Sequence, residues 1–397
     1  MKIKAITLAV AACASLSAQA QISGDTVKIG FITDMSGLYT DIDGAGGAEA
    51  IKMAIADAGG NINGKKIEFI SADHQNKADI AASKAREWID TQGLTMLFGG
   101  TSSGTGLAMA KVAQEKKRVF IVNGAGSSAL TNEQCSPYTV HYAYDTVALA
   151  KGTGSAVIAR GDKSWYFLTA DYAFGQALEA DATKVVKEKG GTVLGSVKHP
   201  LNTSDFSSFL LQAQNSKAQV LALANAGGDT QNAIKAAREF GITKSMKMVG
   251  LLVFVTDVHS LGLKNTEGLL LTTSWDWNLD DKTRAFGKRF FEKTKRMPTD
   301  IQAADYSATM TYLKAVQAAK TVDADKVMET LKSTPIDDFY AKGSIRADGR
   351  FVHDMYLVQV KSPAESKQPW DYYKVVQKLK GEEVFTTKAE SKCALWK

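Results

Sequence analysis

TMLFGGTSSGTGLAMAKVAQE, residues 95–115, holds a strand, a polar turn and a helix in one short stretch. The apolar run 96–98 ends in two glycines, and the hydroxyl-rich turn 101–103 follows. Apolar residues then recur at helical spacing, as at Leu107 and Ala110. This pattern predicts a strand–turn–helix unit, which is the repeating element of α/β folds.

The same alternation extends in both directions from this stretch. It predicts two successive α/β units, each a doubly wound parallel sheet with helices on both faces. The expected strands are 27–33, 67–71, 96–98 and 119–122 in the first unit, and 165–169, 192–197, 220–224 and 247–250 in the second. Later come an apolar strand at 268–277, helices at 282–295, 304–319 and 325–333, and a β-ribbon formed by 351–360 and 372–376.

The first residues have the pattern of an export signal. MKIK is followed by a short apolar stretch and small residues, which predicts a secretory signal at 1–20 with cleavage before Gln21. The sequence before Cys13 also resembles a lipobox, so a lipoprotein anchored at Cys13 is the alternative. We therefore expect an exported, periplasmic protein.

Charge and cysteine content bear on which partners and cofactors the protein can have. The net charge of +6 is mild and the basic residues are scattered, which argues against a nucleic-acid partner. Beyond the signal only Cys135 and Cys393 remain. In an oxidising compartment such a pair is expected to form a disulfide. Cys and His residues show no metal-ligand spacing, so no metal or other cofactor is expected.

Ligands of doubly wound sheets bind beyond the carboxyl ends of the strands. The segments that follow the predicted strands are therefore site candidates. In the first unit they contain hydroxyls and small residues, and in the second unit aromatic and acidic residues; the side chains singled out are Tyr39, Ser102, Ser103, Ala125, Ser127, Tyr172 and Asp229. Hydroxyls and free amides at a helix N-terminus can bind a carboxylate or phosphate. Ser102 or Ser103 could equally serve only as a helix cap.

Three further patterns have competing interpretations. Gly100 to Gly104 matches the nucleophile elbow of serine hydrolases, with Ser102 as nucleophile and His199, His259 or His353 as base. Residues 124–129 match a weak dinucleotide fingerprint. Trp275 and Trp277 share one face of an extended segment, where they either pack in the core or form a wall of the pocket.

The order of these motifs resembles that of the type I periplasmic solute-binding proteins of ABC importers, the leucine/isoleucine/valine-binding class. The resemblance rests on VKIGFITDMSG at 27–37, the block at 61–89, the serine turn, GAGSSALT at 124–131 and LTADYAFGQAL at 168–178. It covers essentially the whole chain after the signal. It implies two lobes joined by a multi-crossover hinge: 21–144 with 275–352, and 145–274 with 353–380, followed by a C-terminal tail at 381–397.

The resemblance also implies roles for residues. Ser102, Ser103, Ala125 and Ser127 would hold a ligand carboxylate, and Asp229 would pair with a ligand ammonium. Asp229 as a cap of the following helix is the alternative. The expected protein is a monomeric, non-enzymatic binding component that presents a small carboxylate-bearing solute to a membrane permease of the ABC type. The expected solute is a branched-chain amino acid.

The sequence does not separate transport from a sensory role, in which an exported module reports its ligand to a membrane receptor, and two further alternatives stay open. The first is an aromatic acid as ligand, which Tyr39, Tyr172 and Trp275 favour. The second is a secreted serine hydrolase that uses Ser102.

Overall fold

Residues 95–115 fold as the strand β4 (Met96–Gly99), the serine turn and the helix α3 (Ser103–Lys116). Every residue of β4 is buried, as expected for a parallel strand covered by helices on both faces. The structure, a computed structural model, describes residues 26–397. The predicted signal at 1–20 and Cys13 lie outside these residues.

The first sheet has the strand order β2-β3-β1-β4-β5-β6. Its pairings are parallel except that of the short β2 with β3. Because β1 pairs with β3 on one side and β4 on the other, the winding direction changes between β1 and β4. Besides β4, the strands are β1 (Thr26–Thr33), β2 (Asn61–Ile62), β3 (Lys65–Asp73), β5 (Val119–Val122) and β6 (Thr139–His141).

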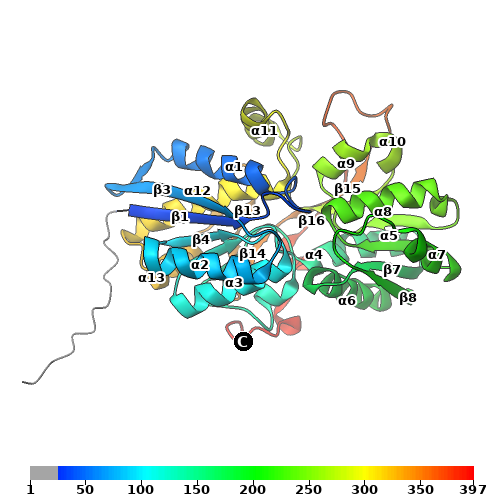
Figure 1. Ribbon diagram of the computed structural model, residues 1–397, viewed down its shortest axis with the longest axis horizontal. Helices are drawn as coiled ribbons and strands as arrows, with labels where there is room; N and C mark the ends of the chain where they lie inside the picture. Colours follow the sequence, from blue (N-terminus) through cyan, green and yellow to red (C-terminus); the bar gives the residue numbers. More distant parts are fainter. Residues whose placement is uncertain (1–25) are drawn as a thin grey trace, which may run out of the picture.

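The second sheet has the order β10-β9-β7-β8 and is parallel throughout. Here β7 pairs with β8 on one side and β9 on the other, so the winding direction changes between β7 and β9. The two sheets form the centres of two lobes that lie side by side (Figure 1). The strands are β7 (Ser164–Ala170), β8 (Thr192–His199), β9 (Val220–Ala224) and β10 (Lys247–Gly250).

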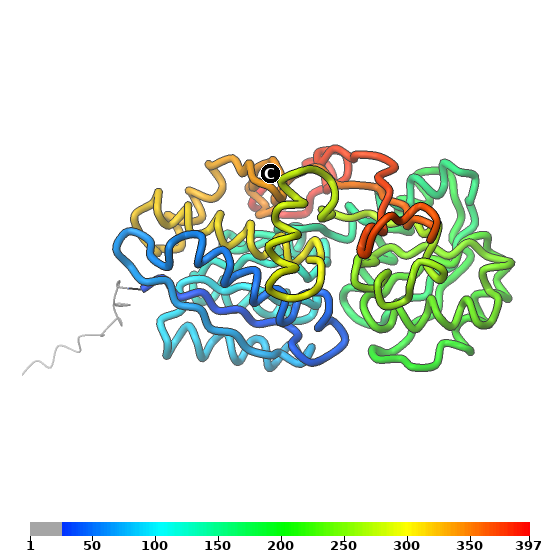
Figure 2. Tube along the Cα trace, turned by 90° about the horizontal axis from the view of Figure 1, so that it is seen from above, coloured from blue at the N-terminus to red at the C-terminus, as the bar shows by residue number. Residues whose placement is uncertain are grey.

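Helices cover both sheets. In the first lobe the elements are α1 (Gly44–Asp57), α2 (Ala78–Gln92), α3, α11 (Asp281–Thr294), α12 (Asp300–Ala319) and α13 (Ala324–Ser333). In the second they are α6 (Ala173–Glu188), α7 (Ser207–Asn215), α8 (Gly227–Glu239), the 3₁₀ turn η3 (Ile242–Lys244), α9 (Val255–Leu261) and α10 (Leu263–Thr266). The late helix α12 packs against the early helix α1, and Arg289 of α11 pairs with Asp57 at 2.6 Å. The first lobe is therefore built from both ends of the chain (Figure 2).

Two small antiparallel sheets complete the fold. One has the order β11-β15-β16 and the other β12-β13-β14. Their strands are β11 (Leu270–Thr273), β12 (Ile336–Asp337), β13 (Lys342–Ile345), β14 (Phe351–His353), β15 (Met355–Val360) and β16 (Tyr373–Leu379). The ribbon expected at 351–360 is therefore two strands in different sheets, separated at Asp354. The strand expected at 268–277 is also shorter, because only β11 pairs with a neighbour.

Residues 146–159 form a continuous helical segment that contains one wide turn. It runs as α4 (Thr146–Leu149), the π-helical turn η2 (Ala150–Gly154) and α5 (Ser155–Ala159). This segment leads from the first sheet to the second. The chain crosses back after β11 and again between β14 and β15. The division into 21–144 with 275–352 and 145–274 with 353–380 stays a prediction.

The predicted disulfide between Cys135 and Cys393 is present, with 5.7 Å between the two Cα atoms. Cys135 follows the 3₁₀ turn η1 (Ser128–Thr131), and Cys393 follows α14 (Gly381–Val384) and the 3₁₀ turn η4 (Lys388–Glu390). Within residues 26–397, no helix has the length and apolar character needed to span a bilayer.

Candidate functional site

A cavity lies where the two winding switches meet, between the lobes. Its lining comes from segments that follow β1, β4, β5 and β6 of one sheet and β7, β9 and β10 of the other. The cavity is small, with a volume of about 10 Å³. The lining residues are Tyr39, Ile42, Thr101, Ser103, Gly124, Gly126, Tyr144, Tyr172, Phe174, Ala226, Leu252 and Phe254.

The serine turn of the first lobe is held by its own hydrogen bonds. Ser102 is the N-cap of α3, and its hydroxyl accepts from the Thr105 amide at 3.4 Å. Ser103 accepts from the Ser127 amide at 3.0 Å, which ties the turn after β4 to the loop after β5. Both serines are buried, at 3 % and 1 % exposure. The hydroxyl proton of Ser103 remains able to donate to a ligand in the cavity.

A buried histidine supports the turn from behind. His74 Nδ1 accepts from the Asn76 amide at 2.9 Å, so the proton of a neutral ring sits on Nε2. Nε2 then donates to Thr105 Oγ1 at 3.3 Å, and that hydroxyl donates to the Ser102 carbonyl at 2.9 Å. Burial lowers the pKa of His74 to about 4, which keeps the ring neutral at pH 7.

A buried acid pair fixes the neighbouring threonine. Asp43 accepts from Thr33 at 2.6 Å and from Thr101 at 3.0 Å. Asp305 lies next to Asp43 and accepts from Asn123 at 2.6 Å. Burial raises the pKa of both acids, and the Asp43 charge raises that of Asp305 further. The Thr101 hydroxyl therefore points away from the cavity, towards Asp43.

The second lobe directs two helix N-termini at the cavity. Tyr172 is the N-cap of α6 and Ala226 the N-cap of α8, and neither side chain caps its helix. Both residues line the cavity. The first amides of a helix have no intrahelical acceptor and carry partial positive charge. These two helix ends therefore favour an acceptor or anion between the lobes.

Two tyrosines join the lobes across the cavity. The hydroxyl oxygens of Tyr39 and Tyr172 are 2.7 Å apart. Tyr39 belongs to a loop fixed by Asp34, whose carboxylate accepts from the Gly37 and Tyr39 amides at 2.7 and 3.0 Å. Burial raises the pKa of both tyrosines, so both stay protonated. One proton fills the shared hydrogen bond, and the other is left to donate.

Asp229 lies in the first turn of α8 but outside the cavity lining. Its two oxygens accept from the Asn202 and Thr203 amides at 3.2 and 2.9 Å. The carboxylate thus holds the loop after β8, and the N-cap position itself belongs to Ala226. Burial raises the pKa of Asp229 to about 6, because two amide donors offset the lost hydration only in part.

The expected site residues fall into two groups. Tyr39, Ser103 and Tyr172 line the cavity, whereas Ser102, Ala125 and Ser127 are chain neighbours of lining residues. Trp275 is elsewhere: its ring packs edge-on against Phe286 and Phe339, and its indole N–H donates to the Phe339 carbonyl at 3.3 Å. Of the two interpretations of Trp275, core packing is the one that the structure shows.

The sequence analysis missed several lining residues. Leu252 and Phe254 follow the predicted strand β10, but the residues after this strand are not among the site candidates. Tyr144 follows β6, a three-residue strand too short to stand out by periodicity. Its hydroxyl donates to the Gly124 carbonyl at 2.8 Å. The rule that ligands bind beyond strand ends would have found Leu252 and Phe254 but not Tyr144, because the sequence pattern does not predict the strand before it.

The geometry around Ser102 does not build a hydrolase. Its hydroxyl contacts the amide and the hydroxyl of Thr105. His199 bonds Asn225 and the Pro200 carbonyl. His353 bonds the backbone carbonyls of Tyr142, Ala143 and Asp354. His259 stacks on Trp370, with 3.8 Å between ring centroids. In the described part of the chain, no group of His, Cys, Asp and Glu side chains could hold a metal ion.

Comparisons with known proteins agree with this architecture. A family model described as "Periplasmic binding protein" matches residues 26–367. A periplasmic binding protein from Burkholderia mallei is 68 % identical, with a TM-score of 0.93 over 94 % of this chain and 100 % of that one. A branched-chain amino acid ABC transporter periplasmic ligand-binding protein from Burkholderia xenovorans is 40 % identical, with a TM-score of 0.84 and the same coverage.

A curated relative, Leu/Ile/Val-binding protein homolog 6 of Brucella melitensis, is 24 % identical over 387 residues, which is 94 % of this chain and 96 % of that protein. The two winding switches, the cavity between them and these matches lead to one conclusion. The chain belongs to the type I periplasmic binding proteins, the non-enzymatic solute-binding components of ABC transporters.

Proposed function

We propose that this protein binds a small carboxylic acid without an ammonium group, aromatic acids among them, and delivers it to an ABC permease from the periplasm. The protein would act as a monomer. The observation that carries the proposal is the composition of the cavity wall. The wall offers hydroxyls, helix N-termini and aromatic rings, and none of its side chains is an acid.

An α-amino acid needs a partner for its ammonium, because an unpaired charge inside a closed cleft is costly. Asp229 is the acid expected for that task, yet it lies behind the lining and already accepts two amide hydrogens. A carboxylate, by contrast, meets the Ser103 hydroxyl, the N-terminus of α3 and two further helix ends. The site therefore suits an anion better than a zwitterion.

The body of the ligand would contact apolar and aromatic groups. Tyr144, Phe174 and Phe254 supply rings, and Ile42 and Leu252 supply aliphatic surface. These residues come from both lobes, so the full contact area forms only when the lobes close. Hinge closure of this kind would create the surface that the permease recognises.

A branched-chain amino acid is the second candidate. The name of the 40 % identical relative from Burkholderia xenovorans supports it. Asp229 is also near enough to Tyr39 and Tyr172 for its charge to contribute to the raised pKa of both phenols. A ligand ammonium placed against the tyrosine hydroxyls would feel that negative charge.

Matched pairs of ligands separate the candidates. Leucine and 4-methylpentanoate differ only by the amino group, as do phenylalanine and 3-phenylpropanoate. Thermal shift and calorimetry with each pair measure what the ammonium contributes. We expect the two amine-free acids to stabilise the protein and the two amino acids to have little effect.

The reverse order, with leucine bound and 4-methylpentanoate rejected, would contradict the proposal in favour of the amino acid. If no member of either pair stabilises the protein, and benzoate fails as well, the carboxylate assignment itself is wrong. Asp229→Asn adds an internal check, since it should weaken only a ligand that carries an ammonium.

A further inference from the structure

The C-terminal tail, residues 381–397, runs along the junction of the lobes on the side of the disulfide. It leaves the sheet of β15 and β16 in the second lobe and ends bonded to the first. In both overall views this segment, in red, lies along the edge of the first lobe, close to where the two lobes meet (Figures 1 and 2). We propose that the tail is a strap that favours lobe closure, tied covalently to one lobe and by an ion pair to the other.

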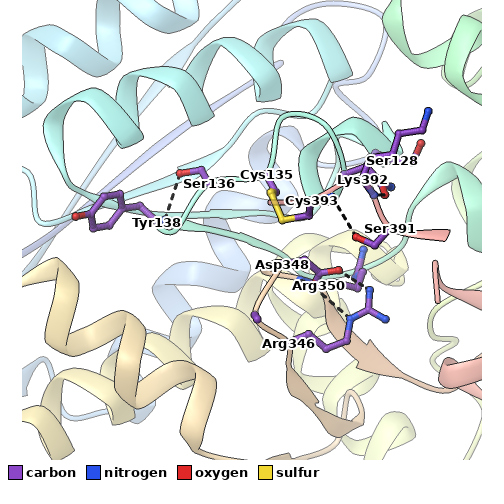
Figure 3. Close-up of a disulfide and its surroundings, with 12 residues drawn as sticks. Ser128, Cys135, Ser136, Tyr138, Arg346, Asp348, Arg350, Ser391, Lys392 and Cys393 are labelled. Atoms are coloured by element: carbon purple, nitrogen blue, oxygen red, sulfur yellow. Dashed lines mark hydrogen bonds and ion pairs between the residues drawn. A yellow bond between two sulfur atoms is a disulfide. The ribbon is translucent and has the colours of Figure 1, made fainter. Parts of the chain in front are cut away.

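The attachment to the first lobe is strong. Cys393 is bonded to Cys135, and the adjacent Lys392 amide donates to Asn132 Oδ1 at 3.2 Å (Figure 3). Arg346, beside β13, donates to the Thr386 carbonyl at 2.8 Å, and its guanidinium lies 3.9 Å from the centre of the Trp396 ring. These contacts fix both ends of the tail segment 386–396 to the first lobe.

The start of the tail is also anchored in the protein interior. The Phe385 side chain is completely buried, and the Arg350 guanidinium lies 4.4 Å from its ring centre. Arg350 in turn donates to the Tyr144 carbonyl at 2.9 Å. Because Tyr144 lines the ligand cavity, the tail and the cavity are separated by only two buried side chains.

Between these anchors, Glu390 reaches the second lobe. One carboxylate oxygen contacts Lys184 Nζ of α6 at 3.0 Å, and the other contacts Lys151 Nζ of the connecting turn η2 at 3.0 Å. Thr387 holds the carboxylate in place through its amide and hydroxyl, each at 3.0 Å. These donors and the two lysines lower the pKa of Glu390 to about 2, so it is ionised at pH 7.

Lys184 sits on a helix that also forms the ligand cavity. The N-terminus of α6 contributes Tyr172 and Phe174 to the cavity wall. Lys184 lies ten residues beyond Phe174, or about 15 Å along the helix axis. One turn before Lys184, Asp181 accepts from Ser128 of the first lobe at 2.9 Å. Movement of α6 away from the first lobe would break both contacts, and Glu390 cannot follow because its tail is tied by the disulfide.

The strap would favour lobe closure whichever solute binds. It is tested by the distance between spin labels at two exposed positions, Lys52 on α1 and Lys235 on α8, measured by pulsed dipolar spectroscopy. Glu390→Gln and Lys184→Gln should each lower the ratio of the short-distance to the long-distance population by about 2- to 5-fold, the range for a partly exposed ion pair. The double variant should add little to either single one, because both remove the same contact.

The matched control is Glu382→Gln, which makes the same chemical change on an exposed tail residue at α14 and should leave the distribution unchanged. Cys135→Ser/Cys393→Ser should lower the ratio at least as much as Glu390→Gln, because it frees the strap. Glu390→Gln and Lys184→Gln are surface changes that leave the cores intact, so they test the strap even if the cysteine variant misfolds. Unchanged distances in both, or an equal response in Glu382→Gln, would overturn the proposal.

Discussion

The two halves of the ligand cavity differ in how their helices begin. In the first lobe, Ser102 caps α3, and His74 and Thr105 hold the capping turn. In the second lobe, Tyr172 and Ala226 begin α6 and α8 without a side-chain cap. The first half has its hydrogen bonds largely satisfied within the protein. In the second half no side chain occupies the first amides of α6 and α8, and the Leu38 carbonyl of the first lobe accepts from the Gly228 amide at 3.5 Å.

This difference assigns an order to binding. A turn that is already held by neighbouring side chains receives a ligand at little entropic cost, because few groups must be ordered. The uncapped helix ends of the second lobe gain an acceptor only when the lobes close on the ligand. We therefore expect the first lobe to bind the ligand first and the second lobe to contribute its binding energy through closure.

The variant with the largest expected effect introduces a larger side chain where the two halves of the cavity touch. A Cβ at Gly126 would lie 2.9 Å from Phe174 and 3.0 Å from Tyr144, closer than carbon atoms pack. Gly126→Val should therefore weaken ligand binding by about 10- to 100-fold through overpacking of the closed form. Calorimetry with the tightest-binding acid of the matched set measures the effect.

Gly104→Ala is the control for this variant, since a Cβ at Gly104 meets nothing within 4 Å. Gly104 lies in the first turn of α3, in the same lobe as Gly126. Equal losses in the two variants, or an unchanged affinity in Gly126→Val, would show that contact between the halves does not govern binding.

A smaller effect follows from removing the cap of the first lobe. Ser102→Ala should lower the free energy of unfolding by about 1 kcal/mol, the usual value for an N-cap serine. Ser102→Asn restores an acceptor at the same position and should recover most of that loss. Urea denaturation of the three proteins provides the comparison, and equal stability of Ser102→Ala and wild type would contradict the capping role.

Adding a cap to the second lobe should have the opposite effect. Ala226→Ser places a hydroxyl at the N-cap of α8 and should raise stability by up to about 1 kcal/mol. The same hydroxyl would occupy amides that the ligand needs, so affinity should fall while the melting temperature rises. A rise in both quantities would mean that the α8 amides do not serve the ligand.

The last test concerns Asp229 and the dependence of stability on pH. Its pKa is raised from 3.8 to about 6 in the folded protein, so the folded state holds this proton more tightly than the unfolded state does. Its contribution to stability therefore decreases as pH rises from about 4 to about 6. Asp229→Asn should remove this decrease, which a pKa raised to about 6 makes about 2 kcal/mol between pH 4 and 7.

Asp205→Asn offers a control of opposite sign. Asp205 is exposed and has a lowered pKa because Ser207 donates to it, so its contribution rises with pH and the substitution should remove that rise. Unfolding free energies at pH 4 and pH 7 for the three proteins complete the test. An Asp229→Asn profile parallel to that of wild type would show that the carboxyl titrates normally.

Much of the fold could be predicted from local pattern. The strands of both parallel sheets are short apolar runs between turn residues, and each lies within a few residues of its predicted place. The family was recognisable from motif order, and the disulfide from the two cysteines alone. The enzyme alternative, a secreted serine hydrolase, was wrong, because the chain belongs to a family of non-enzymatic binding proteins.

The features that could not be predicted from the sequence depend on tertiary contacts. Residues 351–360 alternate as one strand would, but Asp354 divides them between two sheets, and nothing local signals that division. Trp275 and Phe254 are both aromatic residues near strand ends, yet one packs in the core and the other lines the cavity. Asp229 follows β9 as expected, in the first turn of α8. The sequence does not show that its two oxygens accept hydrogen bonds from the Asn202 and Thr203 amides, because that contact depends on where the loop after β8 lies.

The packing of α12 against α1 has a consequence for how the chain acquires its structure. A chain made from its N-terminus presents the six strands of the first sheet long before residues 300–319 exist. Until then, the face of the sheet that α1 and α12 share stays incompletely covered. Contacts between such distant segments also slow folding, because long loops must close first. In the second lobe, the parallel sheet lies within residues 164–250 and the helices α6 to α10 end at Thr266, so this sheet and its helices emerge close together. The parallel sheet expected to receive the ligand first is therefore the one whose covering helices are completed last.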